Sequence, residues 1–117
     1  LLDAGIIVSL FIDPYEEQVR ASAKTGAQFI EMHTGTYSEC FGYEDEEKEF
    51  QKLKNSAELA QSLGLKVNAG HGLNYENVHR MHEIEGLYEL NIGHSIISRA
   101  VFTGLPEAVS KMKELIS

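Results

Sequence analysis

Four short apolar runs, each preceded by a glycine, recur along the sequence. The runs are nearly continuous in apolar residues, as expected of strands that are buried on both faces. A glycine just upstream of a strand is where a preceding helix typically ends. The runs cover residues 6–12, 28–33, 65–71 and 88–94, and the glycines are Gly5, Gly26, Gly64 and Gly86. The sequence therefore predicts four strands, each entered from a helix.

A helical pattern follows each run. After the first, Asp13 is expected to cap a helix that has Pro14 in its first turn. After the second, a polar loop leads into a helical stripe, and after the third, Asn74 is expected to cap a short helix. After the fourth, residues 95–103 are expected to form one short helix, and a second starts at 104–106. The residues expected on buried helix faces are Tyr15, Val19, Ala23, Phe50, Leu53, Ala57, Ala60, Leu63, Val78, Met81, Val109, Met112 and Leu115.

The order of these elements, β-α-β-α-β-α-β-α′-α, predicts an α/β fold with a parallel sheet and right-handed crossovers. Four units in 117 residues give about 29 residues a unit, close to the roughly 31 of an eight-unit barrel. A doubly wound open sheet is the competing architecture, but it favours a G-x-G-x-x-G turn after the first strand, which is absent here. An extra helix before the last long helix is typical of the phosphate site of (β/α)8 barrels. We therefore predict that residues 1–117 are the C-terminal half of a single TIM-barrel domain, strands five to eight with an extra short helix after strand eight.

Composition and charge narrow the class of protein. The net charge of −8 argues against non-specific binding to nucleic acid. The single cysteine, Cys40, favours a reducing cytosol, and no apolar run approaches the roughly 20 residues that span a bilayer. The chain starts without methionine and without a secretory signal, so we expect it to begin inside a larger cytoplasmic protein.

Three of the five histidines fall at the ends of predicted strands: His33, His71 and His94. Active sites of barrels lie at these strand ends, and histidine suits proton transfer near neutral pH. A metal site is the alternative, but no H-x-H or H-E-x-x-H spacing supports it. The glycines beside the histidines instead suggest close approach of the backbone to a ligand, so no metal is predicted. His79 and His82 are expected at the surface.

Glu31 is the most unusual single residue, because it interrupts an apolar strand. By alternation it shares a face with Phe29 and His33, while Ile30 and Met32 face the helices. An ionisable group inside a barrel costs several kcal/mol unless it has a partner. Glu31 is either a structural ion pair or, as we favour, a functional carboxylate. Two equivalent interruptions, which could be hydrogen-bond partners or ligand contacts, are Asn68 and Asn91.

Four segments at the strand ends occur together in a specific order: residues 8–13, 29–35, 65–73 and 89–97. As a set, they resemble the C-terminal half of pyridoxine 5′-phosphate synthase, and the resemblance covers nearly the whole chain. Any one of these segments alone would be a weak signal. Residues 36–49 match the family least, and nothing is carried over to them.

The resemblance implies a condensation of 1-deoxy-D-xylulose 5-phosphate with 3-amino-2-oxopropyl phosphate, which gives pyridoxine 5′-phosphate, phosphate and water. It implies acid–base chemistry without a metal or organic cofactor. It makes His71 the general acid, Glu31 the stabiliser of charged intermediates, and Gly72, Gly93 and His94 contacts to the amino-ketone phosphate. His33 is then interpreted as a support for Glu31.

The expected partners are small phosphorylated substrates, the N-terminal half of the barrel and further copies in a homo-oligomer. The acidic charge and the lack of a long apolar run argue against nucleic acid and membrane as partners. The family's other catalytic residues belong to the N-terminal half, so the 117-residue chain alone is expected to be inactive. Two alternatives remain: a different phosphate-binding barrel synthase or isomerase, and a non-catalytic half-barrel that pairs through its open edges.

Overall fold

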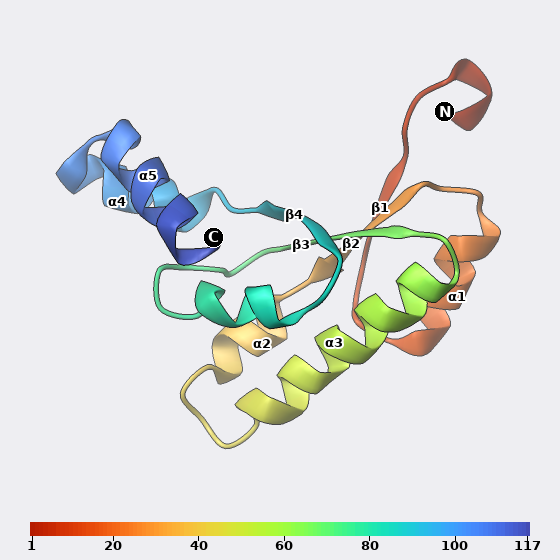
Figure 1. The fold of residues 1–117 in the computed structure, drawn as a ribbon, viewed down its shortest axis with the longest axis horizontal. Helices are drawn as coiled ribbons and strands as arrows, with labels where there is room; N and C mark the ends of the chain where they lie inside the picture. The colour runs from red at the N-terminus through yellow and green to blue at the C-terminus, as the bar shows by residue number, and fades with distance from the viewer.

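A computed structural model describes all residues of the chain, from Leu1 to Ser117. Its centre is a four-stranded parallel sheet in the order β1-β2-β3-β4, so neighbours in sequence are neighbours in space (Figure 1). The strands and helices are 3-10 helix η1 (Leu2–Ala4), β1 (Ser9–Ile12), α1 (Glu16–Lys24), β2 (Phe29–His33), α2 (Gly35–Cys40), α3 (Glu46–Ser62), β3 (Lys66–Gly70), 3-10 helix η2 (Val78–Glu83), β4 (Leu87–Asn91), α4 (His94–Thr103) and α5 (Leu105–Leu115). The predicted alternation of strands and helices is confirmed.

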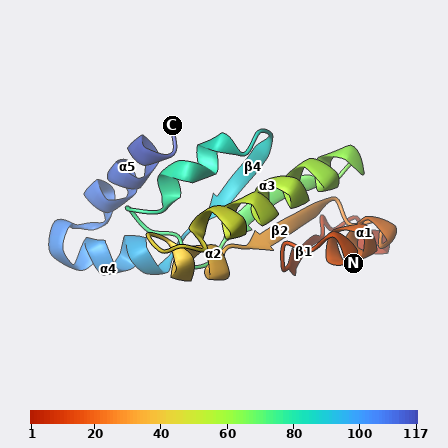
Figure 2. The ribbon, with the colours of Figure 1, turned by 90° about the horizontal axis from the view of Figure 1, so that it is seen from below.

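The core lies between one face of the sheet and the helices α1, α3 and η2, with α3 running along the sheet (Figure 2). Strand residues with alternating burial point into this layer, as Ile30 and Met32 do on β2. The remaining core side chains from the strands and these helices are Val67, Ala69, Val19, Phe50, Leu53, Ala57, Ala60, Val78 and Met81. Helices on one face and strands in sequential order are consistent with half of a (β/α)8 barrel and differ from a doubly wound sheet.

Four local predictions were wrong. Asn74 does not cap η2, whose N-cap residue is Asn77 and which has no side-chain cap. Asp13 does not cap α1, which starts at Glu16 and has no side-chain cap, because the Asp13 carboxylate instead faces His33. The stretch after β2 is not simply a loop, since α2 occupies its first residues. Val109 of α5 is exposed, and the buried residues of that helix are Ala108 and Met112.

Two of the side chains predicted to be buried at helix ends are also exposed. Tyr15, just before α1, and Leu63, just after α3, both reach solvent. Both lie outside the regular turns of their helices, where the helical periodicity no longer fixes the direction of a side chain. The predicted stripes of α1 and α3 are otherwise confirmed by the burial of Val19, Phe50, Leu53, Ala57 and Ala60.

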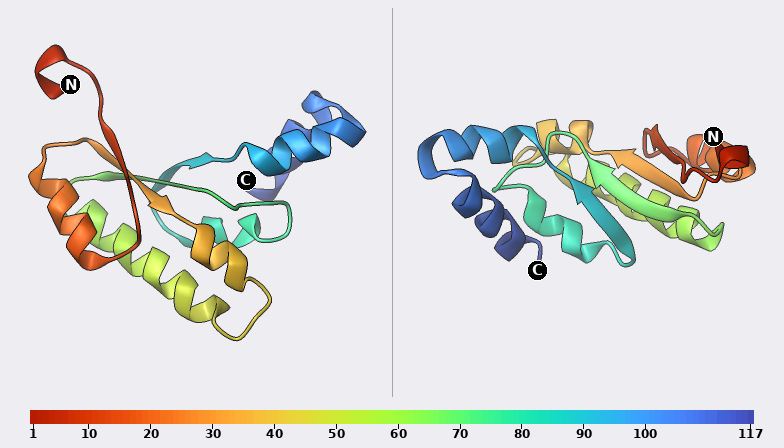
Figure 3. Two further views of the ribbon diagram at one scale, coloured as in Figure 1. Left: turned by 180° about the vertical axis from the view of Figure 1, so that it is seen from behind. Right: turned by 90° about the horizontal axis from the view of Figure 1, so that it is seen from above.

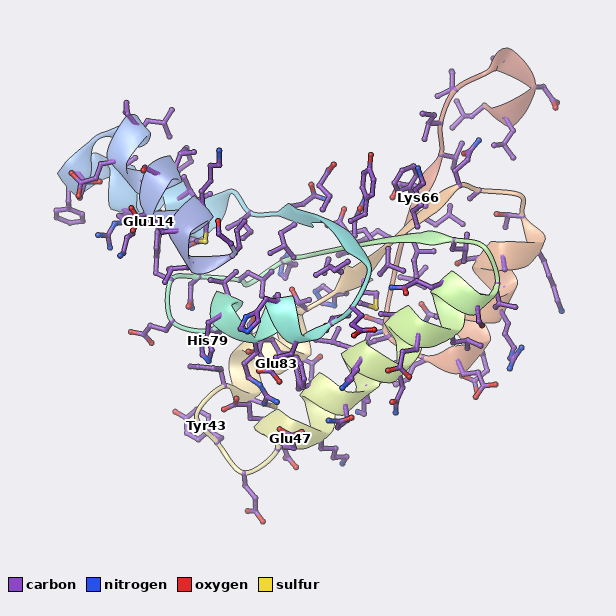
Figure 4. All side chains as sticks on the ribbon, viewed as in Figure 1. Tyr43, Glu47, Lys66, His79, Glu83 and Glu114 are labelled. Carbon is purple, nitrogen blue, oxygen red and sulfur yellow. The ribbon has the colours of Figure 1, made fainter.

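Arg80 joins η2 to the start of α3. Its guanidinium lies 2.8 Å from Glu47 and 3.3 Å from Glu83, both labelled in Figure 4, and 3.2 Å from Glu46. It also lies 3.8 Å above the ring centre of Phe50. The acidic start of α3 thus pairs with a cation from a neighbouring element. His79 and His82 lie on the same 3-10 helix and are exposed, as predicted.

Tyr37 ties α2 to the segment that follows β3. Burial, followed by the negative charge of Glu46, raises the pKa of Tyr37 to about 12. The phenol therefore stays protonated at neutral pH, and it donates a hydrogen bond of 2.7 Å to the carbonyl of Asn77. This bond holds α2 beside the strand ends, where the candidate site lies.

Among the helices, none combines the length and the apolar character that crossing a bilayer requires.

Candidate active site

The five residues predicted for the site line one cavity of about 540 Å³ at the C-terminal ends of the strands. Parallel strands bring these ends to a single edge, and Figure 3 shows α2 and α4 leaving the sheet at that edge. No lysine or arginine lines the cavity. The lining residues are Phe11, Glu31, His71, Gly72, Leu73, Asn74, Asn91, Ile92, Gly93, His94 and Ser95.

His71 follows β3 in a strained turn. Its φ of 82° makes it the only residue other than glycine with a positive φ, and Gly72 follows at 80°. Such a conformation costs about 1–3 kcal/mol and persists only where the surrounding structure imposes it. A Cβ on Gly72 would lie 2.8 Å from the Cβ of Ser38 on α2, so only glycine fits between the turn and that helix. The turn places the His71 imidazole at the cavity.

Thr34 holds this turn in place from the end of β2. Its hydroxyl lies 2.7 Å from the carbonyl oxygen of Gly70 and 2.6 Å from that of His71. Its backbone N–H also donates to the Gly70 carbonyl, at 2.8 Å. Thr34 is fully buried, so water does not compete for these groups. One buried side chain therefore fixes the carbonyls on both sides of the strained peptide.

We expect Thr34→Val to destabilise the complete protein by about 1–3 kcal/mol, because the valine leaves the buried Gly70 carbonyl and the partly buried His71 carbonyl without their hydroxyl donor. The change keeps the shape of the side chain. Chemical denaturation measures the effect, and Thr34→Ser, which keeps the hydroxyl, is the matched control. Equal stability of the valine and serine variants would contradict the role given to the hydroxyl.

Glu31 points to the same cavity from β2. Its Oε2 accepts a hydrogen bond of 2.8 Å from the side-chain amide of Asn91 on β4, across the intervening strand β3. This reach is possible because Gly70 of β3 lies between them. A Cβ at Gly70 would lie 2.5 Å from Glu31 Oε1 and 2.7 Å from the backbone oxygen of Asn91. Asn91 is thus a hydrogen-bond partner of Glu31 as well as a lining residue.

Gly93 and His94 form the start of α4, a ten-residue helix with no side-chain cap at its N-terminus. The first backbone N–H groups of such a helix have no intrahelical partner and carry partial positive charge. The hydroxyl of Ser95 donates a bond of 2.8 Å to the carbonyl of Leu73, which fixes α4 beside the His71–Gly72 turn. The arrangement offers an anion backbone donors instead of a lysine.

The interpretation of His33 as a support for Glu31 was wrong. The His33 ring lies against His71, with 4.8 Å between ring centres, and its Nδ1 is 3.2 Å from Asp13 Oδ1. Asn68 also differs from Asn91, because it is buried away from the cavity lining and its Oδ1 has no partner.

The residues that sequence reasoning missed are Asp13, Thr34 and Gly70. Asp13 has a signal that could have found it, since it directly follows β1, the position that His71 holds after β3. Thr34 has the same signal, since it directly follows β2, whereas the role of Gly70 depends on contacts between strands. No three His, Cys, Asp or Glu side chains gather where they could hold a metal ion.

Comparison with known proteins decides the family. The family model described as pyridoxal phosphate biosynthesis protein PdxJ matches residues 1–117. The chain belongs to this family. The resemblance inferred from the strand-end segments is therefore confirmed.

Relatives in the family are similar over almost all of this chain. Proteins named pyridoxine 5′-phosphate synthase from Geobacter sulfurreducens, Geotalea daltonii and Blochmanniella pennsylvanica are 54%, 51% and 52% identical to it. Each match covers 99% of this chain and 48% of the relative. The chain thus spans about half the length of the curated relatives that it matches.

Proposed function

We propose that the complete protein is a pyridoxine 5′-phosphate synthase, which condenses 1-deoxy-D-xylulose 5-phosphate with 3-amino-2-oxopropyl phosphate. The observation that supports this most is the convergence of Glu31, His71 and the start of α4 on one cavity in a member of this family. The products are pyridoxine 5′-phosphate, phosphate and water.

His71 is the general acid in this proposal. Formation of an imine between amine and ketone, followed by dehydration and ring closure, requires protons to reach leaving oxygens. An imidazole can deliver them near neutral pH. The turn held by Thr34 presents His71 to the cavity from a rigid position, and such positioning contributes to the rate because the donor need not search for its acceptor.

Glu31 stabilises the positive charge of iminium-type intermediates. Its carboxylate lines the cavity and is held by Asn91 through a single hydrogen bond, which leaves Oε1 free of a protein hydrogen bond. A fixed carboxylate beside a developing cation lowers the barrier because its orientation costs nothing during the reaction.

Gly72, Gly93 and His94 bind the phosphate of the amino-ketone substrate. The uncapped start of α4 supports this assignment, because its N–H groups face an exposed position beside the cavity. Gly93 has no atom within 4 Å of the place where its Cβ would be, which leaves room for a phosphate group.

The remaining half of the protein completes a (β/α)8 barrel in this proposal. The sheet face opposite the core supports it, because Phe11 and Tyr88 are 59% and 60% exposed on a surface that a barrel would enclose. Lys66 lies between the rings of Phe29 and Tyr88, at 5.3 and 5.0 Å, on the same open face. The 117-residue chain alone is then inactive, because it holds half of the site.

The complete protein further acts as a cytoplasmic homo-oligomer in this proposal. Exposed apolar residues of α4 support self-association, since Val101 and Phe102 are 79% and 91% exposed.

A turnover assay with both substrates tests the proposal. We expect the complete protein to form pyridoxine 5′-phosphate with equimolar phosphate, and no product when either substrate is omitted. Chromatography of the product and a phosphate assay measure the two. Absence of product from the complete protein, or clear turnover by the isolated 117-residue chain, would contradict it.

A further inference from the structure

Asp13 and His33 have no part in the proposed chemistry. The ring of His33 contacts His71, and Asp13 contacts His33. Asp13 directly follows β1, His33 ends β2 and His71 directly follows β3, so the three come from adjacent strands at one edge of the sheet. His33 Nδ1 lies 3.2 Å from Asp13 Oδ1. The His33 and His71 ring centres are 4.8 Å apart, with the planes tilted by 51°. The three side chains form one continuous row of contacts.

The space around the two rings is restricted on their other sides. A Cβ at Gly35 would lie 2.7 Å from His33 Nε2 and 3.2 Å from His71 Cδ2, so both rings close over this glycine. The ring of Phe11 meets His33 edge-on, with 5.2 Å between centres. His33 therefore has packed neighbours on three sides, and its remaining ring nitrogen faces Gly35 and not the cavity.

His71 needs such a support because it is exposed and its backbone is strained. An unsupported imidazole at a positive φ would sample several rotamers, and few of them would direct a proton into the cavity. A hydrogen bond from Nδ1–H to a carboxylate fixes both the orientation and the tautomer of a histidine ring. Asp13 can do this for His33, and the fixed His33 ring then limits His71.

We propose that Asp13 and His33 are positioning residues that hold the His71 imidazole in its productive orientation. This inference rests on the proposed role of His71 as general acid. Neither residue lines the cavity, so neither touches the substrate. Substrate affinity resides at the start of α4 and the His71–Gly72 turn, which these side chains do not hydrogen-bond. Loss of the support should therefore lower kcat and leave KM nearly unchanged.

Variants of the complete protein test this. Asp13→Ala removes the acceptor, while Asp13→Asn keeps an oxygen at the same place. His33→Asn keeps a donor for Asp13 but removes the ring that contacts His71. We expect kcat to fall about 10-fold in Asp13→Ala and His33→Asn, with KM changed less than about 3-fold. Asp13→Asn should keep kcat within about 3-fold of the unmodified protein.

A double-variant cycle shows whether the effect passes through His71. In a His71→Asn background, Asp13→Ala and His33→Asn should cause no further loss of kcat. The matched control is His82→Asn, at an exposed histidine on η2 outside the cavity, which should leave kcat unchanged. Thermal unfolding of every variant separates misfolding from misorientation.

Unchanged kcat in Asp13→Ala and His33→Asn would overturn the inference. Equal losses in Asp13→Ala and Asp13→Asn would overturn it as well, because charge and not orientation would then be required. The same holds for a full additional loss in the His71→Asn background. If His71→Asn itself keeps normal turnover, the role proposed for His71 fails. If His71→Asn lowers kcat but the Asp13 and His33 variants do not, the positioning role alone fails.

Discussion

Replacing His71 by asparagine in the complete protein is expected to lower kcat by at least about 100-fold, because the variant lacks a group that can deliver a proton near neutral pH. The midpoint of thermal unfolding should shift by less than about 3 °C. Asparagine tolerates a positive φ at least as well as histidine does, so the turn at 82° can form without new strain. Steady-state kinetics and calorimetry measure the two quantities.

A large loss of activity with intact stability would show that His71 contributes to the chemistry and not to stability, although its backbone conformation is strained. The control is His82→Asn, which makes the same chemical change at an exposed position on η2. Turnover within about 3-fold of normal in His71→Asn would contradict the role of general acid and favour a different phosphate-binding barrel enzyme.

Glu31→Gln is the second change with a large expected effect, again at least about 100-fold in kcat. The glutamine oxygen can still accept the hydrogen bond that Asn91 now donates at 2.8 Å. Geometry is therefore kept while the negative charge beside the intermediates is lost. The expected loss in kcat with nearly unchanged KM is measured under saturation with both substrates.

The control for this change is Glu58→Gln, at an exposed glutamate on α3 that does not line the cavity. If Glu31 were only a structural partner of Asn91, its neutral analogue would retain near-normal turnover, and this outcome would contradict the electrostatic role. A loss of stability large enough to account for the loss of activity would also contradict the electrostatic role.

Much of the site could be predicted because each βα unit repeats the same geometry. The C-terminal end of every strand lies at one edge of a parallel sheet, so the position of a residue at the end of a strand can be predicted from the sequence. His71 and His94 were found in this way, Glu31 was found because it interrupts an apolar strand, and Gly72 and Gly93 followed from the family resemblance. All five line the cavity. The side of the sheet to which Glu31 points followed from alternation along β2, as the burial of Ile30 and Met32 confirms.

The partners of these residues could not be predicted in the same way. The sequence pattern predicted that Asp13 caps a helix, because an aspartate before Pro14 fits that pattern well. In the structure, the Asp13 carboxylate turns to the neighbouring strand and meets His33. Helix α2 was also missed, since its six residues are too few to show a period.

The sequence by itself determined the order of the strands and helices along the chain, the face of β2 on which Glu31 lies and the residues at the strand ends, because these follow from local periodicity and from chain connectivity. Only the tertiary structure decided which strand-end groups touch: His33 with His71 and Asp13, Thr34 with the strained turn, and Glu31 with Asn91 over Gly70. The physical reason is register. Contacts between strands depend on how far each strand extends and on which side chains are small enough for longer ones to reach across them. Neither can be predicted from the sequence of one strand.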